Sequence, residues 1–282
     1  MVRIITLMEN TPSEHKALVN QHGLSLLIEA DGHRILFDCG QGDAFWHNAE
    51  KLGISLKHVD TVILSHNHYD HAAGFQDFVG YGGTCDELIV GRDFFDMKFA
   101  SSDMVKFTDL SGGFSEKFLE SNHVKYRFCG DCLEIYPGIY AFTSFERTHA
   151  MEKIPERFVR LKSDGSIVPD DFHDEVCLVI DTPKGLIVIV GCAHPGIMNM
   201  LSSIELHFHK PIYALFGGTH LVEADEERIE KSILEMKQMG LTIFGMCHCS
   251  GEQTDRCLAG HPELKACHLS VGDNIFINDQ TI

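Results

Sequence analysis

Four side chains of types that bind metal ions are crowded into six residues of this sequence. His66, His68, Asp70 and His71 follow an apolar, β-branched run from Val62 to Leu64, which predicts a buried strand. Imidazole nitrogens and a carboxylate oxygen suit zinc, iron or manganese, and a short loop at a strand end can bring them into one cavity. A histidine-rich surface loop is the alternative, but so many ligands at a strand end favour a metal site.

Histidine or cysteine recurs where three later apolar runs end. These residues are Cys192 and His194 after residues 185–190, His220 after residues 211–216, and Cys247, His248 and Cys249 after residues 241–246. Open α/β architectures bind ligands at the carboxyl ends of their strands. The recurrence at successive strand ends therefore predicts that these side chains converge on one site.

The elements that must position these residues alternate between strands and helices, which is typical of an α/β protein. Asp31-Gly32 and Thr182-Pro-Lys184 predict hairpin turns, and Pro195 suits the first turn of a helix. Predicted strands cover residues 2–7, 23–29, 34–37, 62–64, 88–90, 139–142, 176–181, 185–190, 211–216, 241–246 and 271–277, and predicted helices cover residues 45–52, 195–206 and 225–239.

Composition narrows the classes of partner. The chain has 282 residues with 41 acidic against 23 basic side chains and a formal net charge of −18, which disfavours broad contact with nucleic acid or an anionic membrane. A small substrate, including a phosphorylated one, remains compatible with a local basic patch or bound metal. No secretory leader or long apolar run is visible, and the ten cysteines are expected to be reduced, so we expect a cytoplasmic protein.

The segment Ser65-His-Asn-His-Tyr-Asp-His71 resembles the His-x-His-x-Asp-His signature of the metallo-β-lactamase-fold superfamily. The resemblance implies an α/β fold, specifically an αββα sandwich of two similar halves. Residues 1–282 would form a single domain of this kind, with an insertion or lid around residues 91–175. It also implies two divalent metal ions, zinc first, with manganese or iron as alternatives.

Four further phrases resemble one subgroup of that superfamily. They are His22-Gly-Leu-Ser, Gly191-Cys-Ala-His-Pro-Gly-Ile, Phe216-Gly-Gly-Thr-His-Leu and Cys247-His-Cys-Ser-Gly. The subgroup is often named for 7,8-dihydropterin-6-methyl-4-(β-D-ribofuranosyl)aminobenzene-5′-phosphate synthase of methanopterin biosynthesis, and it also contains metal-dependent hydrolases of unknown substrate. The match is weakest between residues 90 and 175.

The resemblance implies a set of ligands. His66 and His68 with a later histidine would bind one metal, and Asp70 and His71 with a last histidine, His248, the other. The later histidine is expected to be His194, with His149 and His173 as alternatives. Asp38 would orient one of the metal-binding histidines, with a simple turn cap as its alternative role.

The order of residues after residue 190 departs from the usual pattern of the superfamily. Cys192 occupies a strand end that normally follows the third histidine, so it is either a metal ligand or a small residue beneath the metals. His220 is expected to bind substrate or metal, and Asp70 to steer the hydroxide, which makes these two the candidate catalytic residues. Cys247 and Cys249 are expected to point away from His248 into the core, as alternation along a strand would require.

The favoured function is a dinuclear metal-dependent hydrolase that attacks a small ester, lactone or phosphoester with a metal-bound hydroxide. The first alternative is a synthase of methanopterin-type pterin biosynthesis that releases pyrophosphate. A di-iron redox protein and a non-catalytic binding protein are further alternatives. The sequence determines neither the substrate nor the oligomeric state.

Two other features are left with alternative interpretations. Phenylalanines between residues 93 and 121 form either a lid or ordinary core packing. They are Phe94, Phe95, Phe99, Phe107, Phe114 and Phe118. Cys129 and Cys132 have the spacing of half a zinc knuckle, but without a second such pair buried thiols are the favoured interpretation.

Overall fold

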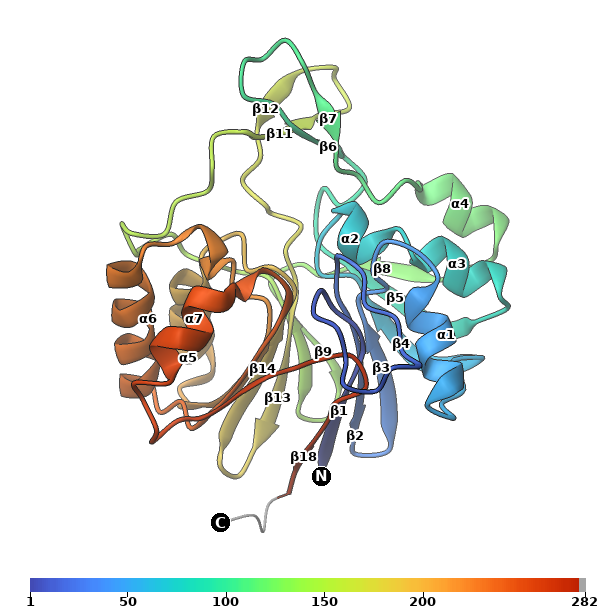
Figure 1. The fold of residues 1–282 in the computed structure, drawn as a ribbon. Helices are drawn as coiled ribbons and strands as arrows, with labels where there is room; N and C mark the ends of the chain where they lie inside the picture. The colour runs from blue at the N-terminus through green and yellow to red at the C-terminus, as the bar shows by residue number, and fades with distance from the viewer. Residues whose placement is uncertain (279–282) are drawn as a thin grey trace. The chain divides into compact units, whose positions relative to one another are not determined.

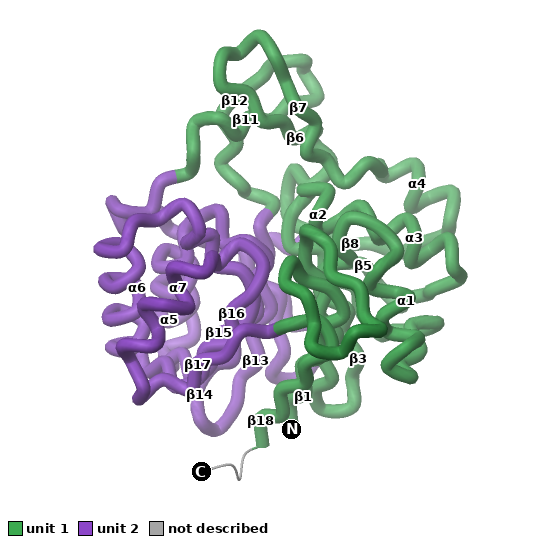
Figure 2. Tube along the Cα trace, viewed as in Figure 1, with its two compact units in different colours: residues 1–128, 154–174, 270–282 green, residues 129–153, 175–269 purple. Residues whose placement is uncertain are grey.

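The computed structural model describes residues 1–278, which divide into two compact units (Figure 2). Unit 1 contains residues 1–128, 154–174 and the chain from residue 270 onward. Unit 2 contains residues 129–153 and 175–269. The prediction of a single domain with an insertion around residues 91–175 stays a prediction, although that stretch contributes to both units.

Unit 1 is built on a seven-stranded sheet in the order β18-β1-β2-β3-β4-β5-β8 (Figure 1). The strands from β18 to β3 pair antiparallel, and those from β3 to β8 pair parallel. Its elements are β1 (Val2–Met8), β2 (Ser25–Ala30), β3 (His33–Phe37), β4 (His58–Ile63), β5 (Thr84–Val90), β8 (Tyr126–Phe128), β18 (Asn274–Ile277), α1 (Ala44–Lys51), α2 (Tyr69–Ala72), α3 (Phe75–Gly80) and α4 (Glu116–Ser121).

Local chemistry explains the elements next to the ligand loop of unit 1. Asp31 and Gly32 have φ angles of 49° and 88°, the left-handed values of the tight turn predicted between β2 and β3. Helix α1 buries Phe45, Trp46 and Ala49 in the core cluster of unit 1. This buried face packs in the same cluster as apolar side chains of β1 to β5.

A small four-stranded sheet, in the order β12-β11-β6-β7, also belongs to unit 1. Its strands are β6 (Met97–Ala100), β7 (Thr108–Asp109), β11 (Phe158–Leu161) and β12 (Ile167–Pro169). Among the phenylalanines of this region, Phe94, Phe95, Phe114 and Phe118 pack in or against the core cluster of unit 1, in agreement with the core-packing interpretation. Phe99 and Phe107 instead contact each other, with ring centroids 6.0 Å apart.

Unit 2 contains the second seven-stranded sheet, in the order β17-β16-β15-β14-β13-β10-β9. Helices α5, α6 and α7 contribute to one core cluster with its strands. The elements are β9 (Cys132–Tyr136), β10 (Ile139–Phe142), β13 (Cys177–Thr182), β14 (Gly185–Val190), β15 (Ile212–Gly217), β16 (Ile243–Met246), β17 (Lys265–His268), α5 (Ile197–Phe208), α6 (Glu226–Gln238), α7 (Glu252–Leu258) and the 3₁₀ turns η1 (Leu221–Glu223) and η2 (His248–Ser250).

The two sheets have the same pattern of strand pairing. Read from β9 to β17, unit 2 has three antiparallel pairings followed by three parallel ones, as unit 1 has from β18 to β8. The predicted construction from two similar halves is therefore confirmed. Strand β14 of unit 2 corresponds to β3 of unit 1, and β15 corresponds to β4.

Helix boundaries in unit 2 follow backbone conformation and capping. Helix α5 begins at Ile197 rather than at Pro195, because Ala193 and Gly196 hold left-handed φ angles of 55° and 98°. Helix α6 begins as predicted, with Oδ1 of Asp225 accepting a hydrogen bond from the backbone N–H of Arg228 at 2.9 Å. Among the helices within residues 1–278, none is long and apolar enough to cross a membrane.

Candidate metal centre

The loop that follows β4 brings its predicted ligands together within unit 1. His66, His68, Asp70 and His71 are all buried. The ring centroid of His66 lies 4.7 Å from that of His68 and 4.3 Å from that of His71. Oδ2 of Asp70 lies 3.8 Å from Nε2 of His71, a separation that two ligands of one ion can have. These residues are called the ligand loop below.

Asp38, at the end of β3, orients this loop. Its Oδ1 accepts the backbone N–H of Ser65 at 2.7 Å, and its Oδ2 accepts both the Ser65 hydroxyl and Nδ1–H of His71, each at 2.7 Å. Because Nδ1–H donates to this carboxylate, the proton of the neutral His71 ring is on Nδ1 and its lone pair is on Nε2. A carboxylate behind the far nitrogen is the usual support of a metal-binding histidine.

His66 is held by the same network. The hydroxyl of Ser65 donates to Asp38, so its oxygen accepts Nδ1–H of His66 at 3.0 Å, and the lone pair of His66 is also on Nε2. Burial lowers the pKa of His66 well below its usual range, and the neighbouring His71 and His68 lower it further. His66 is therefore a neutral imidazole, the form that binds metals.

The residues between 154 and 174 also hold the ligand loop. Oδ2 of Asp174 accepts the backbone N–H of Asn67 at 2.9 Å, and Nζ of Lys98 donates to Oδ1 of Asp174 at 2.8 Å and to Asp170 at 2.9 Å. Burial lowers the pKa of Lys98, but the charges of Asp174 and Asp170 outweigh it and raise the pKa, so Lys98 is a cation. Asp170 and Asp174 are buried, although they lie near the end of the segment predicted as an insertion or lid.

Aromatic contacts position His68. Its ring centroid lies 5.5 Å from that of Phe158 and 5.4 Å from that of Phe172, both from residues 154–174. Its backbone forms an isolated β-bridge with Ser111, which follows β7. Residues in the part of the chain with the weakest sequence pattern therefore hold one of the predicted ligands.

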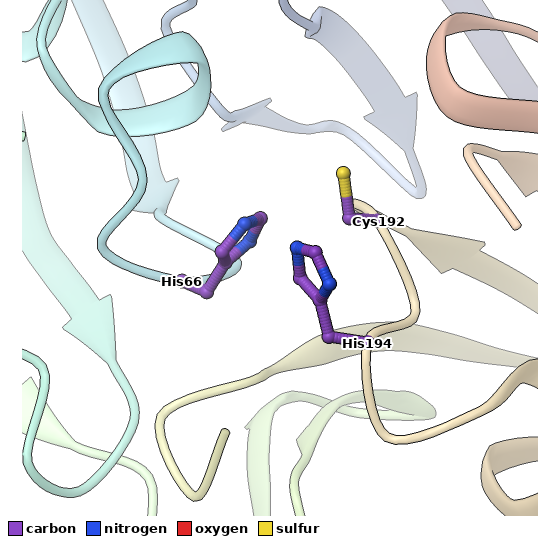
Figure 3. Close-up of side chains that lie close together, drawn as sticks. All are labelled: His66, Cys192 and His194. Atoms are coloured by element: carbon purple, nitrogen blue, oxygen red, sulfur yellow. The ribbon is translucent and has the colours of Figure 1, made fainter. Parts of the chain in front are cut away.

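Unit 2 has a second donor set, centred on Cys192. The sulfur of Cys192 lies within 4.8 Å of a ring nitrogen of His194, of His220 and of His248. Cys192 and His194 come from the loop that follows β14, where Figure 3 labels them. The rings of His194 and His220 have centroids 4.4 Å apart. The ends of β14, β15 and β16 thus bring their predicted ligands together at one edge of the unit 2 sheet.

Cys249 differs from its prediction. The segment after β16 is a 3₁₀ turn rather than a strand, and Cys249 lies within 4.8 Å of the ligand atoms of Cys192 and His220. Burial raises the pKa of the Cys249 thiol, but hydrogen bonds with Cys192 and His220 and the charges of His248 and His220 outweigh it and hold the pKa well below its usual range. Cys247 is fully buried, as predicted.

Left-handed backbone marks the strand ends of unit 2. Ala193, His220 and His248 have φ angles of 55°, 53° and 53°, and each follows a different parallel strand. For a residue other than glycine this conformation costs about 1–2 kcal/mol. Such strain persists where the surrounding structure requires it, which is common at functional sites.

The other candidate histidines lie in different surroundings. Nε2 of His149 lies 2.8 Å from the hydroxyl of Ser202, and its Nδ1 lies 3.5 Å from Glu235. The side chain of His173 is 63% exposed beside Asp171. Sequence reasoning did not assign a role to His22, whose Nε2 lies 3.1 Å from Oδ2 of Asp70. Its only signal was its place in the phrase His22-Gly-Leu-Ser.

The family of the chain follows from comparison with known proteins. The family model described as the metallo-beta-lactamase superfamily matches residues 20–214. The chain belongs to the metallo-beta-lactamase superfamily. This membership confirms the α/β fold class predicted from the His-x-His-x-Asp-His signature, and the members of the superfamily to which the chain is similar are enzymes.

Individual members of the superfamily resemble the chain to different extents. The 7,8-dihydropterin-6-methyl-4-(beta-D-ribofuranosyl)-aminobenzene-5′-phosphate synthase of Methanocaldococcus jannaschii is 31% identical over 89% of this chain and 88% of its own. The crystal structure of a metal-dependent hydrolase of the beta-lactamase superfamily has a TM-score of 0.84 and 27% identity, covering 99% of this chain and 100% of that one. Ribonuclease Z of Methanopyrus kandleri is 43% identical, but only over 24% of this chain and 22% of its own.

Superfamily membership identifies the protein as an enzyme of a metal-dependent family. The donor sets in both units supply residues that could hold a metal ion. The resemblance to the subgroup of the synthase and the hydrolases, predicted from four short phrases, is confirmed by these relatives.

Proposed function

We propose that this protein is a dinuclear metal-dependent hydrolase of a small ester, lactone or phosphoester. The observation that carries the proposal is the buried ligand loop of unit 1, in which Asp38 and Ser65 fix the tautomers of His71 and His66. Such preorganisation is needed to hold an ion for chemistry and has no use in a plain structural loop.

The donor chemistry fits two divalent ions. One ion would be held by His66, His68 and His194, and the other by Asp70, His71 and His248, with Cys192 as an additional ligand. Imidazole, carboxylate and thiolate together suit zinc best, with iron or manganese as alternatives. When bound, the two ions would supply a water activated near neutral pH and hold the oxygen on which charge develops.

The side chains have separate tasks in this proposal. Asp38 and Ser65 keep the Nδ1 protons of His71 and His66 in place, so that both rings keep their lone pairs on Nε2. Asp70 would orient the attacking water, and His22, 3.1 Å from its carboxylate, restricts the rotation of that carboxylate. His220 would contact the substrate or a metal.

A small-molecule substrate is favoured over nucleic acid. The formal net charge of −18 opposes binding to a polyanion, and the similarity to ribonuclease Z covers only about a quarter of the chain. We therefore propose a small substrate, which can be phosphorylated, and a cytoplasmic protein.

A synthase of pterin biosynthesis is the second candidate, favoured by the relative that is 31% identical over most of the chain. In that reaction the same ligands would grip a pyrophosphate leaving group instead of activating water. The two candidates therefore differ in their products rather than in their donor sets.

Metal content and product analysis test both candidates. We expect about two zinc, iron or manganese ions per chain by plasma mass spectrometry, falling in His66→Ala and in His248→Ala. Aryl esters, acyl lactones and aryl phosphodiesters then serve as hydrolase substrates, and a dihydropterin pyrophosphate with an aminobenzene acceptor serves as the synthase substrate. If pyrophosphate is released only when both metal and acceptor are present, the synthase is the function and the hydrolase proposal is rejected. If the protein binds no metal, both proposals are rejected.

A further inference from the structure

We propose that Cys249 is a metal ligand, and that Cys192, His220 and Cys249 form a thiolate-rich metal site within unit 2. The ligand atoms of these three residues all lie within 4.8 Å of one another. The site goes beyond the proposed function, because Cys249 has no part in the dinuclear hydrolase and every ligand comes from unit 2. It also gives His220 a defined role.

The three ligands come from three adjacent strand ends. Cys192 follows β14, His220 follows β15 and Cys249 follows β16, and these strands pair parallel in that order. Parallel neighbours bring their carboxyl ends to the same edge of a sheet. The topology of unit 2 therefore places these side chains together without any contribution from elsewhere in the chain.

The surroundings of the Cys249 sulfur are suited to a thiolate. The backbone N–H of His220, a residue with a left-handed φ of 53°, donates to Sγ of Cys249 at 3.2 Å. A Cβ atom at Gly218 would lie 2.6 Å from the same sulfur, so glycine is required for the chain to pass beside it. Charge-assisted N–H donors are the usual support of an anionic acceptor.

Neighbouring hydrogen bonds hold the loops that carry the ligands. Thr219, next to His220, donates through its backbone N–H and its hydroxyl to the hydroxyl oxygen of Ser250 at 3.2 and 3.1 Å. Oε1 of Glu223 lies 3.6 Å from Nε2 of His220, where a carboxylate can support a coordinating imidazole. The site is therefore preorganised on both sides.

The ligand set selects for a particular class of metal. Two thiolates and one imidazole favour zinc or another soft divalent ion over magnesium or manganese, and a fourth position would be left for water or substrate. Two thiolates also neutralise the charge of a divalent ion. This neutralisation matters for a buried pair of sulfurs, of which Cys192 is 4% and Cys249 is 8% exposed.

Cobalt(II) is the probe for this site, because thiolate-to-cobalt charge transfer absorbs in the near ultraviolet and histidine or carboxylate ligands do not produce that band. We expect the band in the metal-stripped wild-type protein after cobalt is added. Cys249→Ser and Cys192→Ser should each remove about half of its intensity and the double variant all of it. Cys247→Ser, a buried thiol two residues away, is the matched control and should keep the full band.

The experiment separates this site from the hydrolase. A His66→Ala/His68→Ala variant should lose hydrolysis but keep the cobalt–thiolate band. A wild-type band without any hydrolysis would reject the proposed function and leave this site standing. A band of unchanged intensity in Cys249→Ser would overturn the thiolate site, whatever the activity of that variant.

A second measurement requires no variant and so does not depend on whether the variants fold. In the wild-type protein we follow alkylation by iodoacetamide with peptide mass spectrometry. We expect zinc to slow it at Cys192 and Cys249 by more than at Cys247, a fully buried thiol that zinc protects only by stabilising the fold. Equal rates at Cys249 with and without zinc would overturn the proposal.

Discussion

Asp38 shows how one residue can control a metal site without binding the metal itself. It is fully buried, has a φ angle of 58°, and accepts hydrogen bonds from the backbone and side chain of Ser65 and from His71. A buried carboxyl group that accepts three hydrogen bonds stabilises a fixed arrangement of its neighbours. Its role is therefore to hold the ligand loop in the conformation that binds metal.

We expect Asp38→Asn to weaken zinc binding by about 10–100-fold, because the amide keeps the shape of the carboxylate but loses the charge that supports His71. Titration of zinc against a chromophoric competitor measures the change. Asp103→Asn is the matched control, since Asp103 also accepts backbone N–H groups, those of Val105 and Lys106, but is exposed and lies outside the ligand loop. Equal affinities in wild type and Asp38→Asn would contradict this role.

The sequence predicted some residues of the site correctly and others not. The ligand loop was predictable because its histidines and aspartate are adjacent in the chain. Cys249 was misplaced because its prediction assumed strand alternation, whereas His248 has a left-handed φ of 53° and the chain turns there. The buried ion pair of Lys98 with Asp174 could not be predicted, because nothing in the local pattern shows that residues 76 positions apart meet in the interior.

At the scale of elements, the ligand loop depends on the close approach of neighbouring segments. A Cβ atom at Gly74, just before α3, would lie 2.1 Å from the backbone oxygen of Cys39 in the turn that follows β3. The backbone N–H of Cys39 in turn donates to the backbone oxygen of His71 at 2.8 Å. The glycine therefore lets the turn that bears Asp38 reach the ligand loop.

We expect Gly74→Ala to lower the free energy of unfolding by about 1–3 kcal/mol, as overpacking does, and to weaken zinc binding as well. Gly80→Ala is the matched control, because a Cβ there meets nothing within 4 Å and neither glycine has a positive φ. Urea unfolding and zinc titration of both variants are the measurements. A Gly74→Ala protein as stable as Gly80→Ala would show that the turn can move aside.

Strand β6 and residues 170–174 of unit 1 are joined to the ligand loop by a buried charge cluster. Lys98 comes from β6, Asp170 and Asp174 follow β12, and Asp174 accepts the backbone N–H of Asn67. All three charged side chains are buried. Removing the cation would leave two carboxylates in the interior without their partner, which is more costly than removing a whole pair.

We therefore expect Lys98→Met to destabilise the protein by about 3–5 kcal/mol in urea unfolding. Lys162→Met, at an exposed position of the same small-sheet region, should change stability by less than about 0.5 kcal/mol. A loss below about 1 kcal/mol for Lys98→Met would mean that water or rearrangement satisfies the two carboxylates.

At the scale of the whole molecule, the regular parts of the fold were the predictable ones. Apolar runs such as residues 185–190 and 211–216 appear as β14 and as β15, shifted by one residue. Strand β17 (Lys265–His268) was missed because it is polar and has no apolar run to mark it. In the region from 91 to 175 the predicted strand at residues 139–142 is confirmed as β10. The other elements of that region were missed, because its order depends on contacts such as Lys98 with Asp174 rather than on periodicity.

Because both units contain metal-donor sets, we expect metal binding to stabilise the folded protein as a whole. Because an unfolded chain has no preformed site, each ion bound only by the folded state adds about 2.7 kcal/mol of stability at a free concentration 100 times its Kd. For a chain of this size we expect the Tm to rise by about 5–10 °C per filled site when zinc is added to the metal-stripped protein.

Calorimetry of the stripped and the zinc-loaded protein measures this shift. His66→Ala removes a donor of unit 1 and His248→Ala a donor of unit 2, so each should reduce the rise in Tm without abolishing it. Lys162→Met, which carries no donor, should show the full rise. If zinc leaves the Tm of the wild-type protein unchanged, the buried histidines and cysteines hold no ion that stabilises the fold. If neither variant reduces the rise, the stabilising ion is bound by Cys192, His220 and Cys249, as the thiolate-rich site by itself would require.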